Sequence, residues 1–395
     1  MHHLLIKNAK LIGEGVTRQD VCDLLIINGK IVEIGVGLSA DKTLKTIDLK
    51  GKYYVSAGWI DAHTHCFPAS PMYHDEPDLA GVLTGVTTVI DAGSVGADDL
   101  ASFHGFAEKA KTNVFAFINI SRIGLMVQNE LCNMADIDSE AMLAAYQRYP
   151  NFIVGLKARM SKSVVGENGI QPLHRAKSMQ AEVKQATQAA LPLMVHIGND
   201  PPRLDEIADL LEQGDIITHC FNGKPNKILA EDGQLKPAIQ ATLARGVILD
   251  VGHGSASFSF SVAEHSMKVL KLLPDMISSD IYYPNRVNGP VYDLATVMTK
   301  FLSLSLSLET VIAAVTSQPA QILKLHQKGL LKPNFDGDLT IFELKNEAIE
   351  LMDADKICKI HPQQIIPVAA VVAGEWILTT KGAQYHDFIA TESAS

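Results

Sequence analysis

The sequence predicts an α/β protein, a (β/α)8 TIM barrel with a small β-sandwich domain built from both chain ends. Eight short apolar runs recur through the middle of the chain, with longer segments of helical composition between many of them. Both ends instead consist of short apolar or alternating runs between Gly and Asn turns. We therefore expect residues 1–55 and 331–395 to form one discontinuous β-sandwich domain, and residues 56–330 to form the barrel.

The amino-terminal region contains three segments with the texture of strands, HLLIKNAKLI, DLLIINGKIVEIG and KTIDLKGKYYVS. Within the second segment, Asn28 and Gly29 form a turn signal that is typical of a β-hairpin. The carboxy-terminal region has the same texture in DLTIFEL and AAVVAGEWIL, without strong helical periodicity. The two ends are therefore expected to pair with each other beside the barrel.

The eight apolar runs of the middle region are GWIDAH, VTTVIDAG, VFAFINI, FIVGLK, LPLMVH, DIITH, GVILDVGH and MISSD. Segments such as DSEAMLAAYQRYP and HRAKSMQAEVKQATQAA lie between them and have helical composition. A strand followed by a helix, repeated eight times, is what a closed parallel barrel requires. One short apolar run could equally be a piece of buried helix, so the prediction depends on all eight together.

Composition narrows the class of partner. The chain has 395 residues, 47% hydrophobic and 20% charged, which is typical of a globular protein. Its formal net charge of −10 argues against nucleic acid as the main partner. We see neither a long uncharged apolar run nor a secretory signal, and the five cysteines are widely spaced. We therefore expect a cytoplasmic protein with reduced thiols, no membrane contact and a small-molecule substrate. Whether it forms a homo-oligomer is left open.

Most of the eight runs end in a polar or ionisable residue. Active sites of (β/α)8 barrels form at the carboxyl ends of the strands, so these side chains should converge although they are far apart in sequence. They are His63, His65, Asp91, Asn119, Lys157, His196, His219, His253 and Asp280.

The first run places Asp61, His63 and His65 at alternate positions, so they should share one side of a strand. Two imidazoles at the mouth of a barrel are well placed to share one metal ion. We interpret Asp61 as a residue that supports these ligands or the fold. His196 and His219 could each supply an imidazole to a second ion, and Asp280 a carboxylate that binds metal or takes a proton.

Lys157 ends the fourth run, where an ammonium beside two cations would be unfavourable. Burial lowers the pKa of a lysine, and a neutral amine can add carbon dioxide to give a carbamate, an anionic ligand able to bridge two metals. Each of these residues alone has a commoner structural explanation. The joint order His-x-His, Lys, His, His, Asp at strand ends is what predicts a metal centre.

The same segments resemble the amidohydrolase superfamily, in its binuclear, carboxylated-lysine branch. The resemblance covers nearly the whole chain and is carried by GWIDAHTH, GLKARMS, MVHIG, ITHCFNG, SSDIY, SQPAQILKL and GDLTIFEL. Within the superfamily, GLKARMSKSVVG and DVGHGSASFSF are similar to dihydroorotase-like amidohydrolase/deacetylase metallohydrolases.

This resemblance implies two divalent metal ions, usually zinc. His63 and His65 would bind one ion with Asp280, and His196 and His219 would bind the other. Carbon dioxide-derived N6-carboxylysine at Lys157 and a hydroxide would bridge the two ions. The hydroxide would attack an amide, cyclic amide or ester bond, and Asp280 would transfer the proton to the leaving group.

Two departures from the family pattern bear on the substrate. Dihydroorotases carry an arginine that holds the substrate carboxylate at the position where this sequence has Phe67, which argues against dihydroorotate. Adenine deaminases of the related branch lack the lysine, so Lys157 argues against plain nucleobase deamination. Three hypotheses stay open: a hydrolase of amides or esters, a hydrolytic deaminase of a heterocycle such as adenine, and a non-catalytic barrel scaffold.

Three further residues are expected to contact the substrate. Arg159 follows Lys157 by two positions and could clamp a substrate carboxylate, or could instead form a structural salt bridge. His253 ends the seventh run between glycines, where a substrate-binding role and a structural one are evenly matched. Tyr282 and Tyr283 follow Asp280, and both could line the pocket; of the two, we expect Tyr283 to contact the substrate. If Arg159 holds a carboxylate, the substrate is a small acylated or cyclic amide acid.

Overall fold

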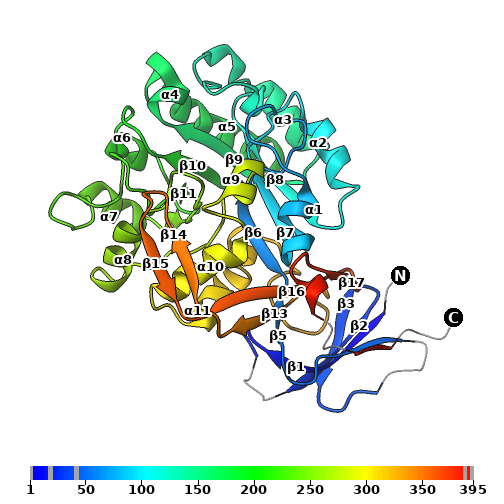
Figure 1. Cartoon of the computed structure of the whole chain (residues 1–395). Helices are drawn as coiled ribbons and strands as arrows, with labels where there is room; N and C mark the ends of the chain where they lie inside the picture. The colour runs from blue at the N-terminus through cyan, green and yellow to red at the C-terminus, as the bar shows by residue number, and fades with distance from the viewer. Residues whose placement is uncertain (1–2, 17–20, 40–43, 386–388, 392–395) are drawn as a thin grey trace.

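The computed structural model describes residues 3–16, 21–39, 44–385 and 389–391, so both outer limits of the predicted β-domain, 1 and 395, lie outside the described residues. Figure 1 shows a barrel wrapped by helices, and beside it a region of strands from the amino-terminal and carboxy-terminal parts of the chain. The predicted fold class is confirmed.

Seven parallel strands form the barrel sheet, and each pairs with its neighbours in sequence order. They are β6 (Trp59–Thr64), β7 (Val86–Ala92), β8 (Asn113–Asn119), β9 (Ile153–Met160), β10 (Leu193–Ile197), β11 (Ile216–Thr218) and β12 (Ile248–Leu249). Each falls on one of the predicted runs.

The prediction of an eighth strand at 276–280, MISSD, is wrong, because this segment does not form a regular strand. The segment does, however, occupy the position of the eighth strand and closes the barrel. Isolated parallel bridges join Met276 to Asp250 and Ile281 to Thr64, so the segment lies between β12 and β6. Asp280 has a left-handed backbone with φ of 50°, which breaks the extended ladder at this point. The barrel is therefore closed by eight segments, of which seven are strands.

Helices connect the strands and cover the barrel (Figure 1). They are α1 (Pro77–Ala80), α2 (Leu100–Ala107), α3 (Ser139–Arg148), α4 (Lys162–Val165), α5 (Gln171–Thr187), α6 (Leu204–Asp209), α7 (Pro237–Ala244), α8 (Phe260–Lys268), α9 (Tyr283–Asn288), α10 (Leu294–Ser303), α11 (Leu308–Ala313) and α12 (Ser317–Ile322). Helix α3 begins where predicted because the Asp138 side chain accepts the amides of Glu140 and Ala141. In the part of the chain that is described, no helix has the length and apolarity needed to cross a membrane.

Both chain ends contribute to one nine-stranded sheet that buries an apolar core of its own. Its strands are β1 (Leu4–Leu11), β2 (Cys22–Ile27), β3 (Lys30–Gly35), β4 (Lys45–Asp48), β5 (Tyr54–Ala57), β13 (Leu339–Lys345), β16 (Gln364–Val372), β17 (Glu375–Leu378) and β18 (Ile389–Thr391). The ends meet where β5 pairs with β13 and β4 with β18, both antiparallel. Strands β14 (Ile349–Met352) and β15 (Cys358–His361) form a separate hairpin.

The predicted turn between β2 and β3 is confirmed. Asn28 and Gly29 have φ of 53° and 73°, the left-handed conformation that a two-residue hairpin turn needs at both positions.

An apolar cluster fills the barrel beneath its carboxyl mouth, and includes Phe117, Met194 and Ile216. Met194 precedes His196 by two residues on β10, so both side chains lie on the same face of the strand. The polar side chains at the mouth of the barrel therefore lie directly above a packed apolar layer.

Candidate metal centre and active site

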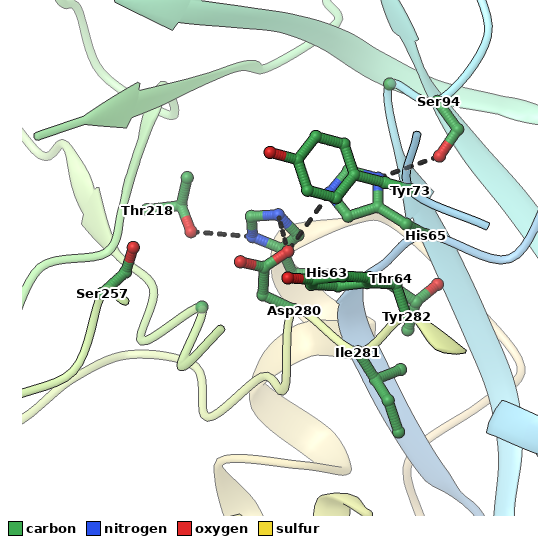
Figure 2. A network of polar contacts seen from close by, with 12 residues as sticks. His63, Thr64, His65, Tyr73, Ser94, Thr218, Ser257, Asp280, Ile281 and Tyr282 are labelled. Carbon is green, nitrogen blue, oxygen red and sulfur yellow. Dashed lines mark hydrogen bonds and ion pairs between the residues drawn. The ribbon is translucent and has the colours of Figure 1, made fainter. Parts of the chain in front are cut away.

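Three of the predicted ligands form a compact cluster at the mouth of the barrel. The nearest ligand atoms of His63, His65 and Asp280 all lie within 4.8 Å of one another. Oδ1 of Asp280 is 3.3 Å from Nε2 of His63 and 3.1 Å from Nε2 of His65. Figure 2 shows the carboxylate facing both rings. This geometry suits a metal ion held by two imidazoles and one carboxylate.

Lys157 reaches the same cluster from β9. Its Nζ lies 3.1 Å from Nε2 of His63 and the side chain is buried. A Cβ at Gly93 would lie 2.7 Å from Cγ of Lys157, so only a glycine there lets the lysine stem pass. The amine thus lies among the other donors.

The remaining two histidines stand beside this group. The ring centroids of His196 and His219 are 4.4 Å apart, and those of His219 and His63 are 5.2 Å apart. All six predicted ligands line a single small cavity of about 120 Å³. The structure therefore brings together side chains from five distant segments of the sequence.

Two of these residues have unusual backbone conformations. His219 and Asp280 adopt left-handed φ angles of 64° and 50°. Such angles are unfavourable for residues with a Cβ, and they are found where the surrounding structure fixes a functional side chain. Gly254 makes room for Asp280, because a Cβ at Gly254 would collide with Oδ2 of that aspartate.

Hydrogen bonds fix how the imidazoles are presented. Nδ1 of His65 lies 2.9 Å from the Ser94 hydroxyl, and Nδ1 of His219 lies 2.6 Å from the carbonyl oxygen of Gly252. In both rings this leaves Nε2 to face the cavity. Contacts of this kind orient ligands around metals and raise their basicity.

Asp61 supports the cluster from outside it, as interpreted from the sequence. Its carboxylate accepts the backbone N–H of Ser279 at 2.9 Å and also the Ser279 hydroxyl. Because Ser279 precedes Asp280, these bonds hold the strained turn that presents the Asp280 carboxylate.

The chain is similar to known proteins over nearly its whole length. Residues 331–376 match the family model of a deacetylase-like composite domain. A deacetylase of Enterococcus faecalis is 43% identical over 375 residues, which are 95% of this chain and 98% of that one. A deacetylase of Brucella anthropi is 36% identical over 387 residues, 96% of this chain and 93% of that one.

Solved structures agree with this. A structure of an adenine deaminase has a TM-score of 0.90 and 42% identity, covering 96% of this chain and all of that one. A structure of a dihydroorotase has a TM-score of 0.85 and 34% identity, covering 96% of this chain and 99% of that one. The chain belongs to the amidohydrolase superfamily, among its deacetylase and dihydroorotase-like members. It is therefore a hydrolase, and the hypothesis of a non-catalytic scaffold is set aside.

The electrostatics of this amidohydrolase site favour ligand binding. Burial lowers the pKa of His63 and His196 well below the ordinary value and that of His219 to about 3, so the rings are neutral. Burial alone would raise the pKa of Asp280, but the nearby imidazoles of His63 and His65 lower it below its usual range. Burial lowers the pKa of Lys157 to about 8, which leaves part of the amine neutral at neutral pH.

Arg159 lines the amidohydrolase cavity but is already bound to a protein carboxylate. Its Nε lies 2.7 Å from Oε1 of Glu130, and its Nη2 lies 2.5 Å from Oε2. Both side chains are buried. The structural salt bridge, one of the two roles considered from the sequence, is therefore present, and this edge of the guanidinium is not open to a substrate carboxylate.

The structure does not place His253 at the cavity, where the substrate-binding role considered from the sequence would require it. The ring does not line the cavity, and both of its nitrogens are engaged. Nδ1 lies 2.8 Å from the carbonyl oxygen of Gly254, and Nε2 accepts from Nζ of Lys300 at 2.8 Å. The imidazole also stacks on Phe258, with 4.6 Å between ring centroids. These contacts favour the structural role over substrate binding.

Of the two tyrosines expected at the pocket, only Tyr282 lines the cavity. Tyr283 is half-exposed, stacks on His74 and does not line the cavity. Tyr282 does line it, and its hydroxyl lies 2.8 Å from that of Ser255. Helix α9 begins at Tyr283, which turns successive side chains in different directions from that residue onward.

Sequence reasoning missed five cavity residues, which are Tyr73, Lys224, Ser255, Ala256 and Ser257. Tyr73 comes from the loop after β6 and packs edge-on against Tyr282, with ring centroids 5.0 Å apart. Lys224 follows His219 by five residues, in the loop after β11. Its place after a ligand-bearing strand end was the available signal, since barrel sites use these loops.

Proposed function

We propose that the protein is a binuclear metal-dependent deacetylase, which cleaves an amide, cyclic amide or ester bond of a small, carboxylate-bearing substrate. The observation that carries the proposal is the convergence of the six predicted ligands, including buried Lys157, on one cavity. The deacetylase relatives at 43% and 36% identity support the choice of bond.

The donor set fits a pair of divalent cations. His63, His65 and Asp280 would hold one ion, and His196 and His219 the other. Lys157, carrying a carboxylate derived from carbon dioxide, would bridge them. Neutral imidazoles, an ionised carboxylate and a carbamate suit zinc, although similar metals accept the same donors.

The ions would activate water and polarise the scissile carbonyl group, as in other two-metal hydrolases. The protein supplies the remaining steps. Asp280 is ionised and held between His63 and His65, so it can accept a proton from water and return it to the leaving group. Tyr282 and Ser255 line the cavity with linked hydroxyls, which can orient the substrate.

Phe67 supports a substrate other than dihydroorotate. The dihydroorotase pattern has an arginine at this position, whereas Phe67 is buried and packs on Phe103, with 5.4 Å between ring centroids. It does not line the cavity. No cationic group can reach the substrate from here.

A second candidate is the hydrolytic deamination of a heterocycle such as adenine. The similarity to an adenine deaminase structure, at 42% identity and a TM-score of 0.90, favours it. The presence of Lys157 weighs against it.

One screen separates the two candidates. Purified metal-loaded protein is assayed in parallel on N-acetyl amino acids, acetylated hydroxy acids, hydantoins, dihydroorotate and adenine. The proposal expects acetate release, reduced roughly 100-fold or more in Asp280→Asn because the proton carrier is lost. Ammonia release from adenine without acetate release from any acetylated compound would instead establish the second candidate.

A further inference from the structure

We propose that Lys224 is the residue that recognises the anionic group of the substrate and so selects acids over their neutral analogues. The inference rests on the proposed function, since it assigns a specificity residue to the same site. It transfers to Lys224 a role that the sequence alone had suggested for Arg159.

Lys224 lies beside the second pair of predicted ligands. It lines the cavity together with His196, His219 and Asp280. A Cβ at Gly198 would lie 3.4 Å from Nε2 of His196 and also 3.4 Å from Cδ of Lys224, so the lysine stem runs close to that imidazole. An anionic group bound at Lys224 would therefore lie in the same cavity as the predicted metal ligands.

The charge of Lys224 is not used by the protein. Within the described ranges, no carboxylate lies within salt-bridge distance of its Nζ, and the contact found is with the neutral hydroxyl of Ser257 at 3.4 Å. Arg159, in contrast, gives Nε and Nη2 to Glu130. The carboxylate of Asp280, which also lines the cavity, is engaged by His63 and His65.

A half-buried ammonium without a counter-charge is costly, because it has lost part of its hydration. Burial accordingly lowers the pKa of Lys224, with Asp280 opposing the shift. A substrate carboxylate would replace the lost hydration with a charge-assisted hydrogen bond, and the hydroxyl of Ser257 could donate a second bond to it. A neutral group of the same shape would stabilise the Lys224 ammonium much less.

The test compares N-acetylglycine with N-acetylglycinamide, which have nearly the same size but differ in charge. Metal-loaded wild type, Lys224→Met and Lys224→Arg are assayed for acetate release. We expect kcat/KM for N-acetylglycine to fall about 10- to 100-fold in Lys224→Met, mainly through KM, which corresponds to one charge-assisted hydrogen bond. The change for N-acetylglycinamide should stay below about 3-fold, and Lys224→Arg should retain much of the preference for the acid.

Equilibrium binding provides a readout that does not need turnover. Calorimetric titration should show tighter binding of N-acetylglycine than of N-acetylglycinamide to wild type, with the preference lost in Lys224→Met. An equal loss for both compounds, no loss, or no preference in wild type would overturn the role of Lys224. Failure to release acetate from any acetylated compound would count against the proposed function, while the titration would still decide the inference.

Discussion

The hydroxyl oxygen of Thr218 lies 2.8 Å from Nδ1 of His63. The same hydroxyl donates to Asp250 at 2.7 Å, so it must accept a hydrogen bond from the imidazole. This fixes the tautomer in which Nε2 of His63 faces Lys157 and Asp280. The buried carboxylate of Asp250 therefore acts on the predicted metal ligand through an intervening threonine.

Thr218→Val keeps the shape of the side chain and removes the hydroxyl. We expect the affinity of the apo-protein for Zn²⁺ to fall about 10- to 100-fold, the usual effect of losing a partner that orients a ligand. Competition with a chromophoric chelator measures it. Thr218→Ser is the matched control and should bind nearly as wild type. Unchanged affinity in Thr218→Val would show that the relay does not orient His63.

Glu130→Gln should destabilise the fold, because it leaves the buried Arg159 guanidinium without its counter-charge. Removing one partner of a buried ion pair costs about 3–5 kcal/mol. Urea unfolding measures the loss, and the double variant Arg159→Met with Glu130→Gln should recover most of it. A loss below about 1 kcal/mol in the single variant would contradict the stabilising role of this ion pair.

Gly254→Ala should lower the catalytic rate more severely than it lowers the stability of the fold. Its Cβ would collide with the Asp280 carboxylate, and a displacement of about 1 Å can cost about 100-fold in rate. Gly169→Ala is the matched control, since Gly169 has φ of 52°, close to the 55° of Gly254, but nothing within 4 Å of the added atom. Both variants should lose unfolding free energy from backbone strain, because a Cβ is unfavourable at these positive φ angles. Equal activity in the two would contradict the role of Gly254.

Lys300 predicts a pH dependence of stability. Burial lowers its pKa from 10.5 to about 7, with Asp353 and Asp293 opposing the shift. Between these values the unfolded chain binds more protons than the folded one, so unfolding free energy rises with pH, by up to about 1.4 kcal/mol per pH unit from this group. Lys300→Met removes this contribution. The difference in unfolding free energy, wild type minus variant, should therefore increase from pH 7.5 to pH 9.5. The same difference in unfolding free energy at both pH values would contradict the prediction.

The features of the site and the fold that could be predicted from the sequence are those that depend on strand order and residue type. Parallel strands end at one mouth, so His63, Lys157, His196 and His219 could be placed together without knowing any loop. The predicted turn at Asn28 and Gly29 likewise depends only on local conformational preference.

The sequence does not predict where side chains point once strands end. His253 turned away because Lys300, 47 residues later, holds its Nε2. Arg159 is engaged by Glu130, which lies on a loop 29 residues earlier. The start of helix α9 determines that Tyr282, and not Tyr283, lines the cavity. These outcomes depend on pairings between loops and helices that carry no local pattern.

The most direct test of the metal centre is the number of divalent ions per chain in wild type and Lys157→Ala, measured by elemental analysis after loading and desalting. If carboxylated Lys157 bridges two ions, wild type should retain about two and the variant at most one. Wild-type protein that retains no divalent ion, or a variant that retains as many as wild type, would contradict the account.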